Sequence, residues 1–484
     1  TRAVEADTTF ALAFYRLSMT QERLAWAEAS RTSAETAYRH SDRLSRRDRD
    51  FLEAVVALRR GNTSQAEQML RTYVRVHPDD PEGWYQLGEV LFHGEPLRGG
   101  SMTAAREPLE RALFYDPGDL GALYHLVRIA IKEGDRERLD SLASRFVALS
   151  PTGDRTLELR ALQAASLGDT VSFREILREM QESPDPFLPI AVWSVAVFGQ
   201  DPSSAEAIAG LMTGPDRPVE VRGAGHVQRA YLAMAGGRRQ KALEELSRAS
   251  ELGDPDAGEA RAWLAALPFG AGSPGERDAA RAALLASENS TMPDSPRPSS
   301  FFSAQNRVHP LVRVYLEGLL SPDPGDAWDG TNGITGWEAM AETEGERALA
   351  RQLATGLRAR GLLQAGDSAG ALEVLSRLVI EGWYELTFVS PYWSGALERF
   401  TRAELLLAAG RPEEALGWYQ GLGENSVSEL AFLGPALLRE AAIHRAAGRD
   451  LRAREARARF NRLWAGADGA FRTEVLARYG TDLP

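Results

Sequence analysis

The sequence predicts an all-α fold in which helical hairpins stack into a solenoid, and three observations support this prediction. Seven glycines recur in one frame of apolar residues, the frame repeats with a period of 34 residues, and no stretch longer than a few residues alternates with the period of two that is typical of a strand. A repeat of this length buries its apolar face only against its neighbours, so a chain built from such repeats folds as a continuous stack.

The glycine frame is the most informative pattern in the chain. Glycine makes up 44 of 484 residues, so chance places one at a given position about once in eleven. Apolar residues lie seven positions before and five positions after each framed glycine. The framed glycines are Gly61, Gly134, Gly168, Gly237, Gly366, Gly410 and Gly448; the earlier residues are Ala54, Val127, Ala161, Ala230, Ala359, Ala403 and Ala441; the later ones are Ala66, Leu139, Phe173, Ala242, Ala371, Ala415 and Ala453.

This frame predicts a helix, a tight turn and a second helix. Glycine ends the first helix because it adopts the left-handed conformation without a Cβ penalty. The next residue often carries a side chain that accepts hydrogen bonds from the free N–H groups of the second helix. We expect Asn62, Asp135, Asp169 and Asp367 to cap in this way, whereas Arg238, Arg411 and Arg449 cannot. Alanine on either side of the turn lets the two helix backbones approach closely.

The spacing of equivalent positions confirms the repeat. Ala54 to Gly88 and Val127 to Ala161 each span 34 residues, and Gly88 to Val127 spans 39 because of five extra residues in Gly94–Met102. We count eight units and a ninth, degenerate one near Ala196–Ala209. One unit, Trp84, Leu87, Gly88, Leu91, Ala105, Leu109, Ala112 and Pro117, resembles the tetratricopeptide repeat signature nearly position for position. The resemblance implies a right-handed superhelix with irregular insertions.

The chain divides into three parts in this interpretation. An N-terminal repeat array covers residues 1–287, a linker or irregular excursion rich in Pro, Gly and Ser covers 288–344, and a C-terminal array covers 345–484. The middle part contains Pro293, Pro296 and Pro298, and we expect Ser321–Gly336 to be a loop. The chain opens on Thr1 with what we expect to be the end of a second helix, so we expect it to be cut from a longer polypeptide.

Composition limits the partners. The net charge of −12 argues against a nucleic acid bound directly by this chain. The longest apolar stretch, Ile190–Phe198, has nine residues, far fewer than the roughly 20 that a membrane span needs. No cysteine is present, which excludes disulfides and thiolate zinc sites. We expect a cytoplasmic location, with the extracytoplasmic part of a membrane-tethered protein as the alternative, and self-association is left open.

Catalytic motifs are not found, and we predict that the chain is not an enzyme and holds no cofactor or metal ion. Lys132 and Lys241 are followed by Glu and Ala, so neither belongs to a phosphate-binding loop. No two histidines are spaced i, i+4. Gly270, Gly272 and Gly275 spell G-x-G-x-x-G, but a helix precedes them where a dinucleotide site needs a strand, so a plain turn is favoured.

Two sets of residues are candidates for partner binding. In repeats of the resembled family the first helices line a concave groove, and the groove positions here are Tyr85, Glu89, Phe92, Tyr124, Arg128 and Ile131. These side chains are suited to an extended peptide, and the alternative is that Tyr85 and Tyr124 pack between neighbouring repeats. The second set is Trp383, Tyr384, Tyr392 and Trp393, which form either an exposed docking surface or a local core under a long connection.

A second resemblance concerns function. The segments DTTFALAFYRL (Asp7–Leu17) and PDDPEGWYQLGEVLF (Pro78–Phe92) are similar to the C-terminal repeat arrays of bacterial multidomain serine/threonine protein kinases or winged-helix transcriptional regulators. That resemblance implies a non-catalytic scaffold for protein or peptide interaction, serving as the sensory or regulatory module of a larger bacterial signalling protein. The alternative is a repeat domain that senses a small ligand, such as a peptidoglycan fragment or a signalling nucleotide.

Overall fold

The computed structural model describes residues 2–23, 27–199, 202–270, 273–286, 300–341, 343–381 and 390–481. Every regular element in these ranges is a helix, which confirms the all-α prediction. The α-helices are α1 (Arg2–Ala6), α2 (Ala11–Arg23), α3 (Ala27–Arg39), α4 (Arg46–Arg59), α5 (Thr63–Val76), α6 (Pro81–Gly94), α7 (Arg106–Tyr115), α8 (Leu120–Glu133), α9 (Arg136–Leu149), α10 (Asp154–Leu167), α11 (Thr170–Gln181), α12 (Phe187–Val197), α13 (Pro202–Met212), α14 (Val219–Ala235), α15 (Arg239–Glu251), α16 (Ala257–Ala266), α17 (Pro274–Ala286), α18 (Ser300–Leu320), α19 (Pro324–Glu338), α20 (Glu344–Gln364), α21 (Ser368–Arg377), α23 (Ala396–Ala408), α24 (Pro412–Gln420), α25 (Leu433–Ala446), α26 (Asp450–Leu463) and α27 (Gly469–Tyr479). Short 3₁₀ turns include η2 (Glu95–Arg98), η3 (Met102–Ala105) and η5 (Ser428–Phe432).

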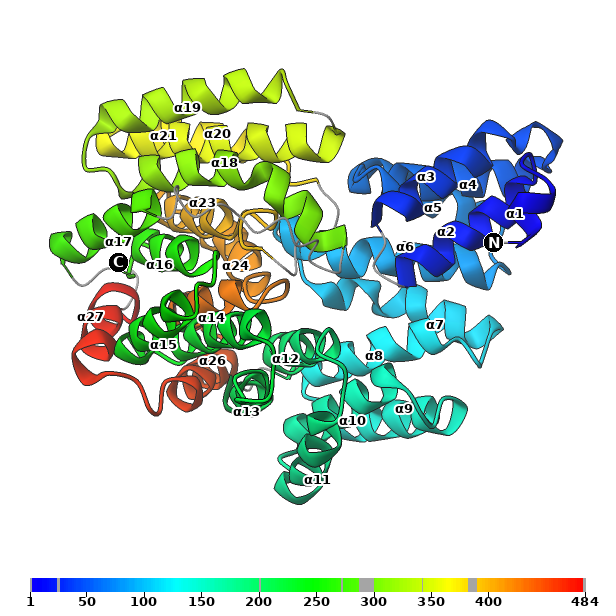
Figure 1. The fold of residues 1–484 in the computed structure, drawn as a ribbon, viewed down its shortest axis with the longest axis horizontal. Helices are drawn as coiled ribbons and strands as arrows, with labels where there is room; N and C mark the ends of the chain where they lie inside the picture. Colours follow the sequence, from blue (N-terminus) through cyan, green and yellow to red (C-terminus); the bar gives the residue numbers. More distant parts are fainter. Residues whose placement is uncertain are drawn as a thin grey trace.

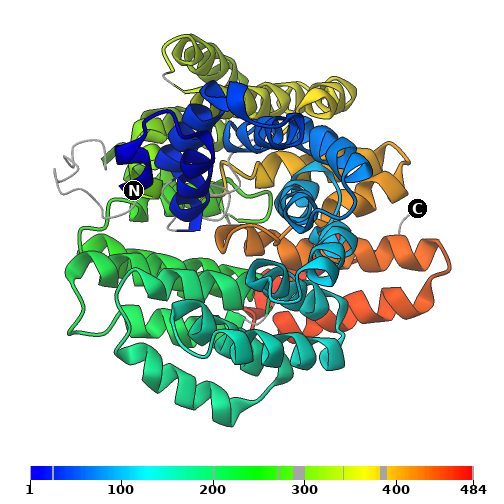
Figure 2. The same ribbon diagram turned by 90° about the vertical axis from the view of Figure 1, so that its right-hand side faces the viewer.

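The helices follow an arc. Figure 1 shows α1–α6 on the right, α7–α11 below them, α12–α15 along the lower edge and α16–α21 at the upper left. The arc turns back on itself, because α18 contacts α3 and the yellow-green helices lie against the dark blue ones in Figure 2. The orange helices α23 and α24 lie in the middle of Figure 1, inside the arc.

All seven framed glycines end their helices as predicted. Each has a positive φ, between 70° and 82°, and each follows the first helix of a hairpin. The apolar residues before and after them in the frame are all buried. The pairs α4·α5, α8·α9, α10·α11, α14·α15, α20·α21, α23·α24 and α25·α26 therefore pack as the sequence predicts.

The capping prediction holds at three of four positions. The side chains of Asp135, Asp169 and Asp367 accept hydrogen bonds from backbone N–H groups in the first turn of the following helix. The prediction for Asn62 is wrong, because its side chain makes no capping bond and α5 begins at Thr63 without one. Arg238, Arg411 and Arg449 do not cap, as expected.

The expected loop at Ser321–Gly336 is wrong. This segment forms α19, which packs on α20. Proline is favoured in the first turn of a helix, and the side chain of Asp323 caps this one by accepting from the Gly325 N–H at 2.8 Å. Glycine allows close packing here, since a Cβ on Gly330 would lie 2.8 Å from a methyl of Leu357.

The described part of 288–344 is thus mainly the two helices α18 and α19 and not an irregular excursion. Pro293, Pro296 and Pro298 lie outside the described residues. The division of the chain at 287 and 344 stays a prediction.

The C-terminal helices are tied to the inside of the arc by hydrogen bonds as well as packing. Trp464 is fully buried, and its indole N–H donates to the Ala235 carbonyl at 3.0 Å. A Cβ on Gly237 would lie 2.7 Å from the Trp464 ring, so this framed glycine also permits a close approach. The Asp468 N–H donates to the Gly237 carbonyl at 3.0 Å.

Aromatic rings join α16 and its following turn to the C-terminal helices. Phe269 is surrounded by Phe400, Phe432 and Tyr479 with ring centroids 6.0, 5.7 and 6.1 Å away, each pair close to edge-to-face. The ring centroids of Trp263 and Tyr392 lie 5.4 Å apart. Edge-to-face pairs are favourable because the positive ring edge meets the negative face of its neighbour. One apolar core therefore continues from Tyr15 to Tyr479.

The five-residue insertion at Gly94–Met102 contacts the C-terminal half directly. Glycines allow its backbone to touch that of α24 and the turn after it: a Cβ on Gly417 would lie 2.4 Å from the Gly99 carbonyl, and one on Gly421 would lie 2.7 Å from the Pro96 carbonyl. At the same place Arg399 donates to the Pro96 and Gly421 carbonyls, each at 3.1 Å.

Arg399 is also paired with a carboxylate. Its guanidinium donates to Glu429 and to the Ser394 carbonyl, and Glu429 accepts a further bond from the Gly423 N–H at 2.9 Å. Both side chains are almost fully inaccessible to solvent. Hydrogen bonds to the remaining polar atoms make a buried ion pair tolerable, and four protein groups supply them here, while Glu429 Oε2 has no hydrogen-bond partner among the described residues.

Among the described helices, none combines the length and apolarity that crossing a bilayer requires.

The helix crossings give a direct test of the frame. Ala230 and Ala403 have no exposed surface, so Ala230→Trp or Ala403→Trp must force the paired helices apart. We expect each to lower the free energy of unfolding by roughly 1–3 kcal/mol in urea denaturation, while the exposed Glu244→Ala change has little effect. Equal effects of the three changes would show that these alanines are not at crossings.

Candidate functional site

The six predicted groove residues lie close together at the contact of α6 and α8, but they do not form an open surface. Glu89, Phe92, Tyr124 and Arg128 are buried, and Tyr85 and Ile131 are half-buried. Tyr85 packs against α8 so closely that a Cβ on Gly121 would lie 2.6 Å from its ring. Burial favours the alternative in which these side chains pack between repeats, and their role in partner binding stays a prediction.

Arg128 is the centre of a buried polar cluster. Its guanidinium donates to Glu158 at 2.7 Å and to Ser194 at 3.3 Å, and it lies over the Tyr124 ring with its carbon 3.5 Å from the centroid. The Tyr124 hydroxyl donates to the same carboxylate at 2.7 Å. Burial raises the pKa of Tyr124, so its hydroxyl stays a donor. The cluster joins α8, α10 and α12 through charge that is fully paired.

Glu89 lies between two histidines on the other side of this cluster. Its carboxylate is 3.6 Å from His93 Nε2 and 3.5 Å from His125 Nδ1. Burial lowers the pKa of both His93 and His125 to about 3, so both imidazoles are neutral at pH 7. Glu89 and His93 have the i, i+4 spacing of a metal-binding pair, but a pattern that requires two histidines does not include them.

Residues from the C-terminal half cover the inner ends of these helices. The Trp193 indole donates to the Asn425 carbonyl at 2.6 Å, and the Lys132 ammonium pairs with Glu424 at 2.6 Å. Glu424 also accepts from the Met102 N–H at 2.9 Å. The position at which an open solenoid would admit a peptide is therefore occupied by the chain's own 421–432 segment.

The second predicted set is not a surface where it is described. Tyr392 and Trp393 are buried in the main core, which supports the alternative of a local core. Trp383 and Tyr384 lie outside the described residues.

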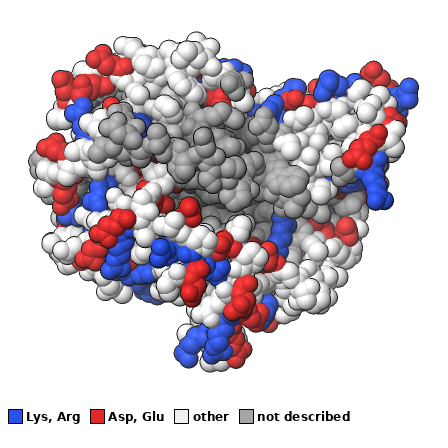
Figure 3. All heavy atoms as spheres, in the orientation of Figure 1, with Lys and Arg blue, Asp and Glu red and all other residues white. Residues whose placement is uncertain are grey.

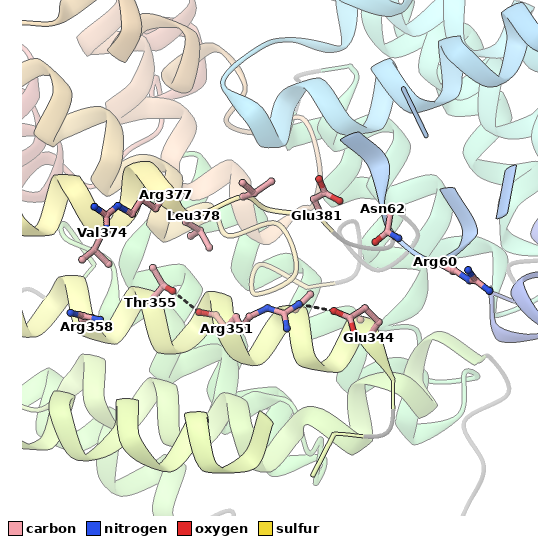
Figure 4. A pocket seen from close by; sticks show the side chains of 14 residues that line it. Arg60, Asn62, Glu344, Arg351, Thr355, Arg358, Val374, Arg377, Leu378 and Glu381 are labelled. Carbon is pink, nitrogen blue, oxygen red and sulfur yellow. Dashed lines mark hydrogen bonds and ion pairs between the residues drawn. The ribbon is translucent and has the colours of Figure 1, made fainter. Parts of the chain in front are cut away.

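A surface cleft of about 570 Å³ opens where the two ends of the arc approach each other. One wall is the turn between α4 and α5, which contributes Arg60, Gly61 and Asn62, and the other is the hairpin α20–α21 (Figure 4). Figure 4 shows the turn that carries Arg60 and Asn62 across the cleft from the helix that carries Glu344 and Arg351. The repeat fold positions both walls, because Gly61 is one of the framed glycines and α20–α21 is a framed hairpin.

Positive charge predominates in this cleft although the chain as a whole is acidic. Its lining contains four arginines and two glutamates, a surplus of two positive charges, against −12 for the whole chain. The charged lining residues are Arg60, Arg351, Arg358, Arg377, Glu344 and Glu381. On the face shown in Figure 3, acidic and basic side chains are intermixed over the described surface.

Three of the four arginines of the cleft already form ion pairs: Arg60 pairs with Glu35 at 3.0 Å, and Arg377 pairs with Glu373. Arg351 pairs with Glu344 at 2.7 Å and with Glu338 at 3.1 Å, and hydrogen bonds from Arg351 and Arg347 hold the pKa of Glu344 below its usual value. Arg358, by contrast, is exposed and forms no ion pair with another described residue. Exposed Val379 and half-buried Leu378 add an apolar strip beside these charges.

The repeat signature matches a known family over part of the chain. Residues 51–122 match the tetratricopeptide repeat model. This segment runs from within α4 to the first turn of α8 and so includes one wall of the cleft. The tetratricopeptide prediction is confirmed for these residues, and the similarity to kinase or winged-helix regulator arrays stays a prediction.

Among curated proteins, a 141-residue stretch is 30% identical to the Cellulose synthase operon protein C of Xanthomonas axonopodis pv. citri (strain 306). The stretch is 27% of this chain and only 9% of that relative. Among solved structures, the P58(IPK) TPR domain overlaps 87% of this chain at 14% identity with a TM-score of 0.21. The Naa15/Naa10 complex bound to HypK-THB overlaps 90% at 13% identity with a TM-score of 0.24. These TM-scores are too low to support any inference about arrangement or binding.

The Arg128 cluster yields a test of burial. Arg128→Ala would leave Glu158 charged and unpaired in the interior, so we expect the free energy of unfolding to fall by about 3–5 kcal/mol in urea denaturation. The double variant Arg128→Met with Glu158→Gln removes both charges and should recover part of that loss. The exposed Arg174→Ala change is the control. If Arg128→Ala is as stable as Arg174→Ala, the side chain is exposed and the original groove prediction is restored.

Proposed function

We propose that this chain is a non-catalytic helical-repeat scaffold that binds an acidic peptide segment of a protein partner in the cleft between the α4–α5 turn and the α20–α21 hairpin. The observation that carries the proposal is the surplus of positive charge in this cleft of an otherwise acidic chain. Tetratricopeptide repeats generally serve as protein-interaction scaffolds, and the match at residues 51–122 supports the same class of function here.

The shape and chemistry of the cleft favour a peptide with both carboxylates and apolar side chains. Arginine binds carboxylates through two parallel hydrogen bonds, and Arg358 forms no ion pair with another described residue. The apolar strip of Leu378 and Val379, together with Val374, offers apolar contact next to those donors. Long-range attraction between an acidic segment and this cleft would also raise the association rate at low salt.

A small anionic ligand is the alternative occupant. A volume of about 570 Å³ falls within the usual range of small-molecule sites, so a signalling nucleotide or an acidic peptidoglycan fragment would fit. We prefer the peptide because the described lining is spread over two separate hairpins and contains no aromatic side chain. The net charge of −12 argues against nucleic acid as the partner.

We also propose that the chain acts as the sensory or regulatory module of a larger bacterial signalling protein. The segments that resemble the repeat arrays of multidomain kinases and winged-helix regulators support this role. A cytoplasmic location, with an extracytoplasmic position in a membrane-tethered protein as the alternative, belongs to the same proposal.

A labelled peptide tests the cleft. We expect a ten-residue fluorescein peptide rich in glutamate with two leucines to bind saturably in a fluorescence-polarisation titration, and a matched lysine peptide not to bind. Each exposed ion pair contributes about 0.5–1 kcal/mol, so Arg358→Ala with Arg377→Ala should weaken binding by roughly five- to thirtyfold. High salt should weaken it further.

The control is a double change with the same effect on net charge. Arg46 and Arg174 are exposed arginines that do not line the cleft, and Arg46 lies on α4 about 20 Å from Arg60 at the usual helical rise. Equal weakening by Arg46→Ala with Arg174→Ala would show that only net charge matters and would contradict the cleft. Displacement of the peptide by an equimolar mononucleotide would favour the small-anion alternative.

A further inference from the structure

Three side chains of the types that bind transition metals meet where α6 packs on α8. Glu89 and His93 are one helical turn apart on the same face of α6, and His125 comes from α8. One potential ligand atom from each residue lies within 4.8 Å of the other two. This group is separate from the peptide cleft, and nothing in the proposed function uses it.

The spacing is close to that of a coordination sphere. Zinc binds nitrogen and oxygen ligands at about 2.0–2.1 Å, which places neighbouring ligand atoms of a tetrahedral site about 3.3–3.4 Å apart. Glu89 Oε2 is already 3.6 Å from His93 Nε2, and one potential ligand atom from each of the three residues lies within 4.8 Å of the other two. Two histidines and one glutamate form a known zinc-binding set that leaves a fourth position open.

The surroundings hold the ligands in place. His125 Nδ1 lies 2.8 Å from the Gly121 carbonyl, a hydrogen bond that orients the ring and leaves Nε2 as the nitrogen that would bind the ion. The Phe92 ring packs against both imidazoles, with centroids 5.0 Å from His93 and 4.6 Å from His125. Arg128 pairs with Glu158, and Arg155 lies near both Glu158 and Glu89, so an added cation would share the Glu89 carboxylate with Arg155.

Access to the group is from one side. The side chain of His93 is 22% exposed, whereas those of Glu89 and His125 are 7% and 8% exposed. An ion would therefore enter beside His93, and its fourth coordination position would face solvent there.

We propose that Glu89, His93 and His125 bind one Zn²⁺ ion that links α6 to α8, with water or an added ligand in the fourth position. Because such a site forms only when the two helices are packed together, the ion binds the folded state and stabilises it by mass action. The contact between two repeats would then depend on zinc.

Metal titration of the full chain tests this proposal. The protein is treated with EDTA, dialysed, and titrated with Zn²⁺ in a calorimeter and with Co²⁺ in a spectrophotometer. We expect one ion per chain, intense visible d–d bands from tetrahedral Co²⁺, and a higher melting temperature with Zn²⁺. His93→Ala and Glu89→Gln should each weaken binding by more than about tenfold.

Two controls make the outcome decisive. His40→Ala removes a histidine that is outside the group and should leave binding unchanged. Circular dichroism checks that each variant is folded; because His93 is partly exposed, its variant decides the question even if Glu89→Gln unfolds. Failure of the wild-type chain to bind Co²⁺ or Zn²⁺ stoichiometrically, or undiminished binding by folded His93→Ala, would overturn the proposal.

Discussion

The buried pair of Arg399 and Glu429 is the interaction on which the arrangement of the whole chain depends. Arg399 connects the insertion after α6 to the turn after α24 through hydrogen bonds to both. Glu429 accepts hydrogen bonds from Arg399 and from the Gly423 N–H, which holds the 423–429 segment at the same place. These contacts fix the C-terminal helices inside the arc of the preceding ones. Without a partner, either charge would be strongly destabilising in an interior, so the pair also makes this arrangement specific.

Filling the arc changes where a partner can bind. In an open solenoid the inner faces of α6 and α8 would be available, but here they meet α10, α12 and the C-terminal segment, and their polar side chains pair with each other. The accessible charged cleft lies instead at the rim, between the α4–α5 turn and α20–α21. A scaffold of this shape offers a local binding site in place of a continuous concave surface.

The sequence was sufficient to predict the helical hairpins but not how the arc of hairpins turns back and encloses the C-terminal helices. Residues such as Ala230 and Gly237 act within one hairpin, so their spacing alone predicts a helix crossing and a left-handed turn. The burial of Arg128 depends on contacts between residues far apart in the chain. So does the cleft, which brings Arg60 and Arg377 to opposite walls. No local period encodes such contacts. The prediction of a loop at Ser321–Gly336 is wrong because its proline and glycines are compatible with a capped helix that packs closely on its neighbour.

Small-angle X-ray scattering measures most directly whether the C-terminal helices fill the arc. A compact chain of 484 residues has a radius of gyration of about 23 Å by the usual scaling for globular proteins. We predict a value near this, with a distance distribution that has a single, nearly symmetric maximum. A radius of gyration well above 30 Å with an extended tail, as expected for roughly the same number of residues in an open superhelix, would contradict the account.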